Sequence, residues 1–303
     1  LEINGNRNGD GGVVNAFDTN TTDNRGIWLD ELVGDLRVDQ IFSEADVSLR
    51  TVGGSVVDAR NDALVNVRSQ ALDIDANGAG AEIGDAFNPL EVDTSRGVAN
   101  PGTAAGGVDV GLEATGDITL TEVAEHLRVV LAHSYEGDIV LRVLDSLPQG
   151  EDFVLVDSGT ARFAESAARD PGQHADAPRV IDHGTVFAEQ GEVGIFAGDD
   201  IDLDSNSRIY AAEDILLAAD LGVADPDFGA TVDLRGRIIA GGDLVTPGSQ
   251  SGGDPLGVME PTYTAPQHRT TVQTGLDVDV IRFGDTGGAA GTTGWGDPGY
   301  IFL

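Results

Sequence analysis

Residues 199–213 (DDIDLDSNSRIYAAE) have the residue types and spacing best suited to binding a cation. Asp202, Asp204 and Asn206 stand at the first, third and fifth positions of a possible EF-hand loop. Glu213 stands at the twelfth position, but the sixth is serine where that loop requires glycine. Both flanks alternate like strands rather than helices. The stretch therefore favours a calcium site of another geometry over an EF-hand.

One face of a strand could carry that other site. Asp200, Asp202 and Asp204 alternate with Ile201 and Leu203, so three carboxylates project from one face while the aliphatic side chains enter a core. Carboxylate and amide oxygens are the ligands that calcium prefers. The predicted calcium ligands are Asp200, Asp202, Asp204, Asn206 and Glu213. The alternative is a ladder of solvated aspartates that holds no metal.

Three other polar stretches offer weaker chemistry. Residues 4–12 (NGNRNGDGG) contain a single carboxylate and are better explained as a glycine and asparagine turn than as a cation loop. The same holds for 224–229 (ADPDFG), where two aspartates lie near a turn. The histidines and aspartates within 174–183 lack a zinc-ligand spacing, and no serine lies in a GxSxG sequence. No catalytic residue is predicted.

The composition limits the classes of partner. The 303 residues include no Cys, and 52 Asp and Glu against 17 basic residues, all Arg, give a formal charge of −35. Phosphates would be repelled, so nucleic acid and anionic membranes are excluded as direct partners. No apolar run is long enough to span a bilayer. A start at Leu1 without a signal region and an apolar end at 299–303 lead us to expect a piece of a longer polypeptide.

Short alternations of aliphatic and polar residues, separated by Gly, Asp and Asn, predict strands. These strands must position any cation or catalytic site. The predicted strands are 46–52, 55–59, 72–76, 90–94, 108–114, 117–121, 138–144, 153–158, 200–205, 214–219, 231–240 and 277–283. Only 160–170 has a helical pattern, and it predicts one short helix.

A unit of Asp, aliphatic, any residue and Leu recurs along the chain. Its copies begin at Asp46, Asp117, Asp138, Asp200 and Asp214. Recurring units that cannot bury their apolar face alone are typical of stacked repeats, and this pattern predicts a parallel β-solenoid. The alternative is a β-sandwich, whose hairpins favour Asn-Gly and Asp-Gly turns that are scarce here.

Two longer sequence segments, which we call the repeated lines, also resemble each other: IWLDELVGDLRV (27–38) and ITLTEVAEHLRV (118–129). Their shared aliphatic positions predict inward stacks, which we expect to bury Ile27, Leu29, Leu36 and Val38, and likewise Ile118, Leu120, Leu127 and Val129. An active site rarely occurs twice along one scaffold. The shared polar residues are therefore predicted to lie on the surface, at equivalent points of two coils: Glu31 and Glu122, and Arg37 and Arg128.

The segments GDLRVDQIFSEADVSLRTVGGSVVDA (34–59) and GDITLTEVAEHLRVVLAHSYEGDIVLRV (116–143) resemble the repeats of filamentous-haemagglutinin-like large exoproteins. The resemblance covers about half the chain, over 26–94, 107–144 and 191–245. It implies a right-handed parallel β-helix with loop excursions, in a bacterial surface adhesin. The secretion signature of that family is absent, so the resemblance implies nothing about the route of export.

The expected organisation follows from the repeats and from the Pro- and Gly-rich interruptions. Residues 1–25 form an N-terminal Gly- and Asn-rich segment, and 26–144 form β-helix coils. A loop-rich excursion (145–190) separates these from further coils (191–245), and 246–303 form a Pro- and Gly-rich loop with terminal strands.

The expected function is a structural or adhesive segment of a large secreted or cell-surface bacterial protein, a rigid acidic stalk or filament stabilised by calcium. Its partners would be neighbouring copies, the remaining parts of the same long protein, or cell-surface glycans. The alternative is a polysaccharide lyase or glycoside hydrolase that uses the Asp200, Asp202 and Asp204 cluster. The few aromatic residues, 5% of the chain, do not indicate a platform for sugar rings.

Overall fold

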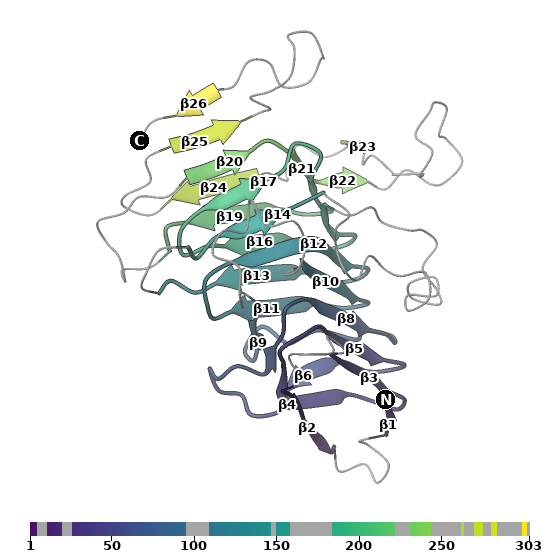
Figure 1. Cartoon of the computed structure of the whole chain (residues 1–303). Coiled ribbons are helices and arrows are strands. Elements are labelled where there is room, and N and C mark those ends of the chain that lie inside the picture. The colour runs from purple at the N-terminus through teal and green to yellow at the C-terminus, as the bar shows by residue number, and fades with distance from the viewer. Residues whose placement is uncertain are drawn as a thin grey trace.

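The computed structural model describes residues 1–4, 11–19, 26–94, 109–146, 150–157, 184–221 and 231–243, together with the backbone of four short strands between 262 and 301. Within this part of the chain every regular element is a strand, and the strands form parallel sheets (Figure 1). The predicted all-β class with parallel pairing is confirmed. None of the described segments is a helix long and apolar enough to cross a membrane.

Two large sheets contain nearly all strands, and we name them sheet A and sheet B. Sheet A contains, in order of pairing, β1 (Glu2–Ile3), β3 (Ile27–Glu31), β5 (Val47–Thr51), β8 (Leu72–Ala76), β10 (Asp109–Ala114), β12 (Leu127–Ser134), β14 (Phe153–Leu155), β17 (Ile201–Leu203), β20 (Thr231–Leu234), β25 (Val280–Phe283) and β26 (Gly299–Ile301). Three further strands form a branch of sheet A, namely β15 (Thr185–Ala188), β18 (Arg208–Ala211) and β21 (Arg237–Ala240).

Sheet B is built in the same way. It contains β2 (Val13–Asp18), β4 (Leu36–Ser43), β7 (Val67–Arg68), β9 (Leu90–Asp93), β11 (Ile118–Glu122), β13 (Ile139–Val143), β16 (Val193–Phe196), β19 (Ile215–Ala219) and β24 (Thr270–Thr274), with β6 (Val56–Asp58) beside β4. A separate antiparallel pair joins β22 (Gly242–Asp243) to β23 (Thr262–Tyr263). The other antiparallel pair is β25 with β26.

The chain passes repeatedly from sheet A to sheet B and back, and we call one pass through both sheets a coil. Each strand pairs with strands of the neighbouring coils, so that β11 lies between β9 and β13 in parallel register. Sheet A divides at β12, where residues 127–129 pair with β14 and residues 131–134 pair with β15. The stacked coils in Figure 1 therefore follow directly from this alternation of strands.

A large hydrophobic core runs through the stack. In β8 the side chains of Leu72, Ile74 and Ala76 are buried while Asp73 and Asp75 are half-exposed, as the alternation of the sequence predicts. One cluster of buried aliphatic residues extends from Leu29 to Ala240. The aliphatic positions predicted from the repeated lines are buried, except that Ile27 is half-buried against the same cluster.

The two repeated lines occupy opposite sheets. Residues 27–31 form β3 of sheet A, but the matching residues 118–122 form β11 of sheet B. The second halves are exchanged in the same way, with β4 in sheet B and β12 in sheet A. Both sheets present the same aliphatic alternation to one shared core, so the same strand, turn and strand sequence fits either position. The prediction of equivalent points in two coils is wrong.

The prediction that the shared polar residues lie on the surface is also wrong for three of the four. Glu31 and Glu122 are buried at the ends of β3 and β11, and Arg128 is buried on β12, whereas Arg37 is half-buried. Each glutamate accepts a hydrogen bond from the backbone N–H two residues later, over 3.2 Å in both cases. The carboxylate therefore closes the turn that leaves the strand, which explains why the residue is repeated.

Glu122 and Arg128 have further buried partners. The Glu122 carboxylate accepts the N–H of Thr94 at 3.0 Å and its hydroxyl at 2.7 Å. Burial raises the pKa of Glu122 well above its usual range, and the Thr94 hydrogen bonds offset part of this shift. Arg128 forms an ion pair with buried Asp109, its register neighbour on β10. A buried charge is tolerated only when it is paired in this way.

Close approaches between coils explain two of the turn glycines. Gly26 has a φ of +68°, and a Cβ there would lie 2.1 Å from the backbone oxygen of Asp46 in the next coil. Gly84 has a φ of +63°, and a Cβ there would lie 2.2 Å from the backbone oxygen of Thr119. Both the left-handed backbone and the missing side chain are therefore required at these turns.

Several predicted boundaries and sites can be compared with the described residues. The coils extend into the predicted N-terminal segment, because β2 pairs with β4, and into the predicted excursion, because β14 and β15 belong to sheet A. Four predicted features lie outside the described residues. They are most of the candidate loop at 4–12, the predicted helix 160–170, the histidine-containing stretch 174–183 and the stretch 224–229.

Candidate functional site

The predicted calcium ligands are divided between sheet A and the turns that follow. Asp200 precedes β17, Asp202 lies in it and Asp204 follows it, so these three side chains alternate with buried Ile201 and Leu203 as predicted. Asn206 is exposed in the turn before β18, and Glu213 is exposed beyond β18, before β19 of sheet B. The strand β18 therefore separates Glu213 from the three aspartates.

The cation beside these aspartates is an arginine. Arg235, which follows β20, forms an ion pair with Asp202 and lies 4.0 Å from Asp204. Its Nε is also 3.5 Å from Asp233 Oδ2. Within the described ranges no group of three His, Cys, Asp or Glu could hold a metal ion. In this arrangement the guanidinium of Arg235 provides a counter-charge for the ladder.

Replacing Arg235 with glutamine is expected to lower the free energy of unfolding by about 1–2 kcal/mol, because several half-exposed carboxylates lose their counter-charge. EDTA is expected to leave the melting temperature unchanged, because Arg235 and not a divalent ion balances the ladder. The exposed Arg142, replaced in the same way, should change stability by less than about 1 kcal/mol. A melt that EDTA lowers by several degrees would contradict the assignment.

A second group of carboxyls lies where β14 and β17 begin. Burial, and then the charge of Asp200, raise the pKa of Asp152 to about 7. Glu151 is fully buried and accepts a hydrogen bond from the Ser146 hydroxyl. Burial, opposed in part by Ser146, together with the charge of Asp199, raises the pKa of Glu151 to about 7. These two carboxyls titrate in the range that a general acid would need.

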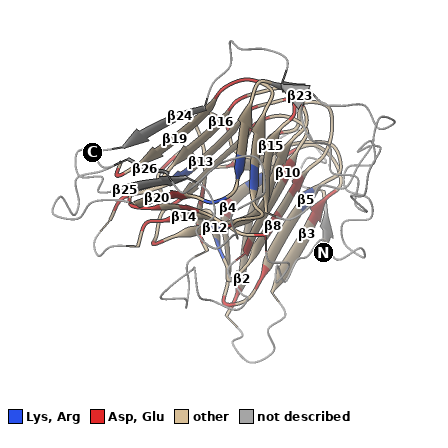
Figure 2. Ribbon diagram, turned by 90° about the horizontal axis from the view of Figure 1, so that it is seen from above, with Lys and Arg blue, Asp and Glu red and all other residues tan. Residues whose placement is uncertain are grey.

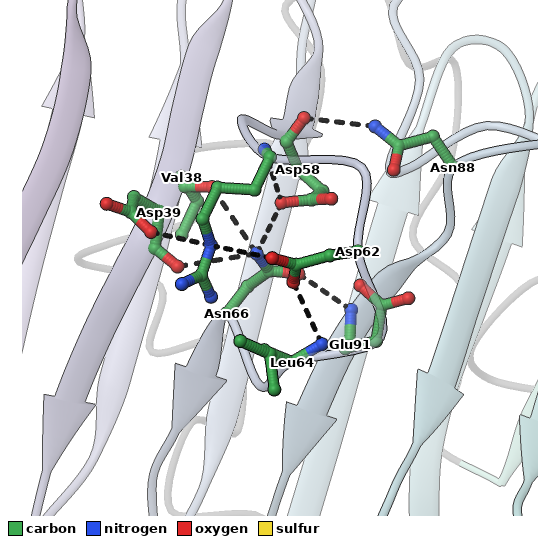
Figure 3. Close-up of polar contacts among 9 residues, drawn as sticks. Val38, Asp39, Asp58, Asp62, Leu64, Asn66, Asn88 and Glu91 are labelled. Carbon is green, nitrogen blue, oxygen red and sulfur yellow. Dashed lines mark hydrogen bonds and ion pairs between the residues drawn. The ribbon is translucent and has the colours of Figure 1, made fainter.

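A third polar group, the Asp58–Asn66–Glu91 cluster, lies on sheet B around the turn between β6 and β7 (Figure 3). Asn66 is completely buried, and its side-chain amide donates to Asp58 Oδ1 over 2.6 Å. The amide oxygen of Asn66 accepts the N–H of Glu91 at 3.0 Å. The amide therefore links the strand end at Asp58 to β9 of the next coil.

The two carboxyls of this cluster are buried on either side of Asn66. Asp58 and Glu91 are only 4% and 5% exposed, and each has one buried oxygen without a hydrogen-bond partner among the described residues. Burial, and then the charge of Asp58, raise the pKa of Glu91 to about 7. Outside this pair, Arg60 lies 2.7 Å from Asp39 and 3.7 Å from Asp62. The cluster therefore fixes a turn and carries a proton near neutral pH.

A histidine between two carboxylates forms the fourth group. His133 Nε2 lies 2.9 Å from Glu189 Oε1, and His133 Nδ1 lies 3.8 Å from Glu113 Oε1. The ring stacks on Phe187 with centroids 5.4 Å apart, and Tyr135 lies against it at 4.1 Å. Histidine beside a carboxylate is a common arrangement for acid and base catalysis.

Burial limits what this histidine can do. His133 is 0% exposed and Glu113 is 3% exposed, so a substrate could not reach the ring without movement of the surrounding chain. The group joins three strands that lie in register, because His133 is opposite Glu113 on β10 and Phe187 on β15. The arrangement is therefore best suited to holding β12 and the branch of sheet A together.

Sequence reasoning missed the second, third and fourth groups. Glu113, His133 and Glu189 meet only because two coils and a long insertion bring them together. The spacing of these residues in the sequence does not predict the contact. The pairing of Asn66 with Asp58 and Glu91 is likewise a product of coil register. Figure 2 shows acidic residues along the strands and turns of both sheets and few basic ones, so the charge pattern alone marks no single site.

In comparisons with known proteins, no family model, no curated protein and no solved structure matches this chain.

Proposed function

We propose that this chain is a segment of a large secreted or cell-surface bacterial protein, in which stacked coils form a rigid acidic scaffold with an adhesive role. The coils would be those of a right-handed parallel β-helix of the filamentous-haemagglutinin-like kind. The observation that carries the proposal is the large hydrophobic core that runs from Leu29 to Ala240 through both sheets. A repeated core of this kind yields an extended body whose outer face is available for contacts.

The polar groups support a scaffold rather than a reaction centre. Glu31 and Glu122 close turns, Arg128 is paired with Asp109, and Arg235 neutralises the aspartate ladder. Each contact joins one coil to the next or closes a turn, and each therefore contributes to the stack. The scaffold does not require calcium, because Arg235 provides a counter-charge beside Asp202 and Asp204.

One observation favours a second function, that of a polysaccharide-active enzyme. Glu151 and Asp152 are neighbouring carboxyls whose pKa values are raised to about 7, and a glycoside hydrolase uses one carboxyl of raised pKa as its acid. Glu151 is fully buried, however, so its side chain does not meet solvent where a sugar would bind.

The two functions are separated by a test for product release. The full chain, incubated with alginate, polygalacturonate, hyaluronan and starch, is expected to release neither reducing ends nor unsaturated uronates. The variant Glu151→Gln serves as the matched control, because it keeps the shape of the side chain and removes the titrating group. Product release that this variant abolishes would replace the scaffold proposal with the enzyme.

A further inference from the structure

Two turns of sheet B present a large apolar side chain in the same way. Residues 62–64 read Asp-Ala-Leu and residues 85–87 read Asp-Ala-Phe. Asp62 Oδ1 accepts the N–H of Leu64 at 3.0 Å, and Asp85 Oδ1 accepts the N–H of Phe87 at 2.7 Å. An aspartate that accepts the N–H two residues later fixes a tight turn. The same sequence therefore produces the same turn twice, each with an apolar residue at its tip.

The two turns are neighbours. The first lies between β6 and β7, and the second lies just before β9, the strand that pairs with β7 in the next coil. The side-chain amide of Asn88 donates to the backbone oxygen of Asp58 over 3.0 Å and so ties the second turn to the end of β6, which leads into the first turn (Figure 3). Backbone hydrogen bonds of 2.9 and 3.1 Å between Asp85 and Asn88 close the second turn. Both tips are therefore held in fixed positions.

Both tips are largely exposed to solvent. Phe87 is 92% exposed and Leu64 is 56% exposed, although apolar side chains of this size contribute most when they are buried. A single exposed apolar residue needs no explanation. Two of them, fixed by the same kind of hydrogen bond in adjacent coils, form a repeated apolar feature that can fill pockets of a partner.

The charged residues around the tips indicate the charge of that partner. Asp39, Asp62, Asp85 and the partly exposed Glu82 lie around the two turns, with Arg60 as the basic residue between Asp39 and Asp62. The charges of Asp117, Asp85 and Asp35 all act on Glu82, in addition to its burial. A second copy of this chain would bring a like charge of −35, and anionic lipid would also be repelled. A basic surface with apolar pockets fits best.

We propose that Leu64 and Phe87 are the two anchors of a docking surface for a basic, amphipathic protein segment. The proposal deepens the adhesive role given above and rests on it, because it names the face through which the scaffold binds. The carboxylates would attract the basic segment, and the two apolar tips would determine its position.

The probe is a cationic peptide of alternating Leu and Lys, compared with a peptide of alternating Ser and Lys that has equal charge. The full chain is expected to bind the Leu and Lys peptide roughly ten- to a hundredfold more tightly, as measured by fluorescence anisotropy at physiological salt. The double variant Leu64→Ser with Phe87→Ser should lose that difference. The variant Val52→Ser with Leu221→Ser, which changes two exposed apolar residues elsewhere, should retain it.

Three outcomes would overturn the proposal. An equal affinity for both peptides would show attraction by charge alone, and an unchanged preference in the Leu64 and Phe87 variant would place the surface elsewhere. Self-association, or binding to phosphatidylcholine vesicles, that disappears in this variant would assign the tips to a second copy or to lipid. The scaffold proposal is tested separately, by the assay for product release. It stands if the peptide does not bind.

Discussion

Replacing Asn66 with aspartate is expected to lower the free energy of unfolding by about 3–5 kcal/mol near pH 8. Asn66 is completely buried and donates to Asp58 Oδ1 at 2.6 Å, so an aspartate would exchange this hydrogen bond for a repulsion between two buried carboxylates. Glu91 lies on the other side and would be a third negative group. Urea unfolding of the full chain measures the loss.

The exposed Asn15 on β2 provides the matched control. Asn15→Asp makes the same chemical change where water solvates the new charge, and it should alter stability by less than about 0.5 kcal/mol. Part of the loss at position 66 should be recovered near pH 5, because a protonated aspartate can again donate. Equal stability of both variants near pH 8 would contradict the role given to the Asp58–Asn66–Glu91 cluster.

The fold is expected to become more stable as the pH falls from about 8 to about 5, which is the reverse of ordinary acid denaturation. The pKa values of Glu91, Glu151 and Asp152 are each raised to about 7, and that of Glu122 is raised well above its usual range. An acid whose pKa is higher in the folded state binds its proton more tightly there. Protonation below about pH 7 therefore stabilises the fold, and the gain is complete once the pH falls below the unfolded values of 4.5 and 3.8.

His126 acts in the opposite direction. Burial, and then the charge of Arg128, lower the pKa of His126 from 6.5 to about 4, so that its protonation favours the unfolded chain below about pH 6.5. One such base against four acids leaves a net gain toward about pH 5, and we expect a melting temperature about 5–10 °C higher there than near pH 8.5. Glu91→Gln should raise the melting temperature near pH 8.5 and flatten the profile. A melting temperature that rises steadily with pH would contradict this account.

The strands could be predicted from the sequence because alternation is a local property. The aliphatic positions of 72–76 and 118–122 mark buried side chains whatever the neighbouring strand is, and β8 and β11 occupy these positions. The parallel pairing followed from the repeated unit of Asp, aliphatic, any residue and Leu, because repeats stack on their copies. The sheet that each line occupies could not be predicted, since both sheets face one core.

The burial of the shared glutamates could not be predicted in the same way. Glu31 and Glu122 look like surface residues by type, and only the turn geometry reveals a backbone N–H two residues later for each carboxylate to accept. Repetition favoured a structural role for these residues but did not distinguish a buried structural role from an exposed one. The Asp-Ala-Leu and Asp-Ala-Phe turns can be recognised in the sequence, because each has an aspartate two residues before a large apolar residue.

The arrangement of parallel coils is the central claim, and engineered disulfides test it most directly because the chain has no Cys of its own. In β11 and β13, Thr119 is in register with Val140, and Thr121 is in register with Arg142. Neighbouring parallel positions lie roughly 5 Å apart, within the range that a disulfide spans, whereas positions two residues out of register lie roughly 8 Å apart. Oxidation of the folded protein should therefore cross-link Cys at 119 with Cys at 140, and Cys at 121 with Cys at 142. An antiparallel sandwich would instead cross-link 119 with 142 and 121 with 140, and that result would contradict the stacked coils on which the proposed scaffold depends.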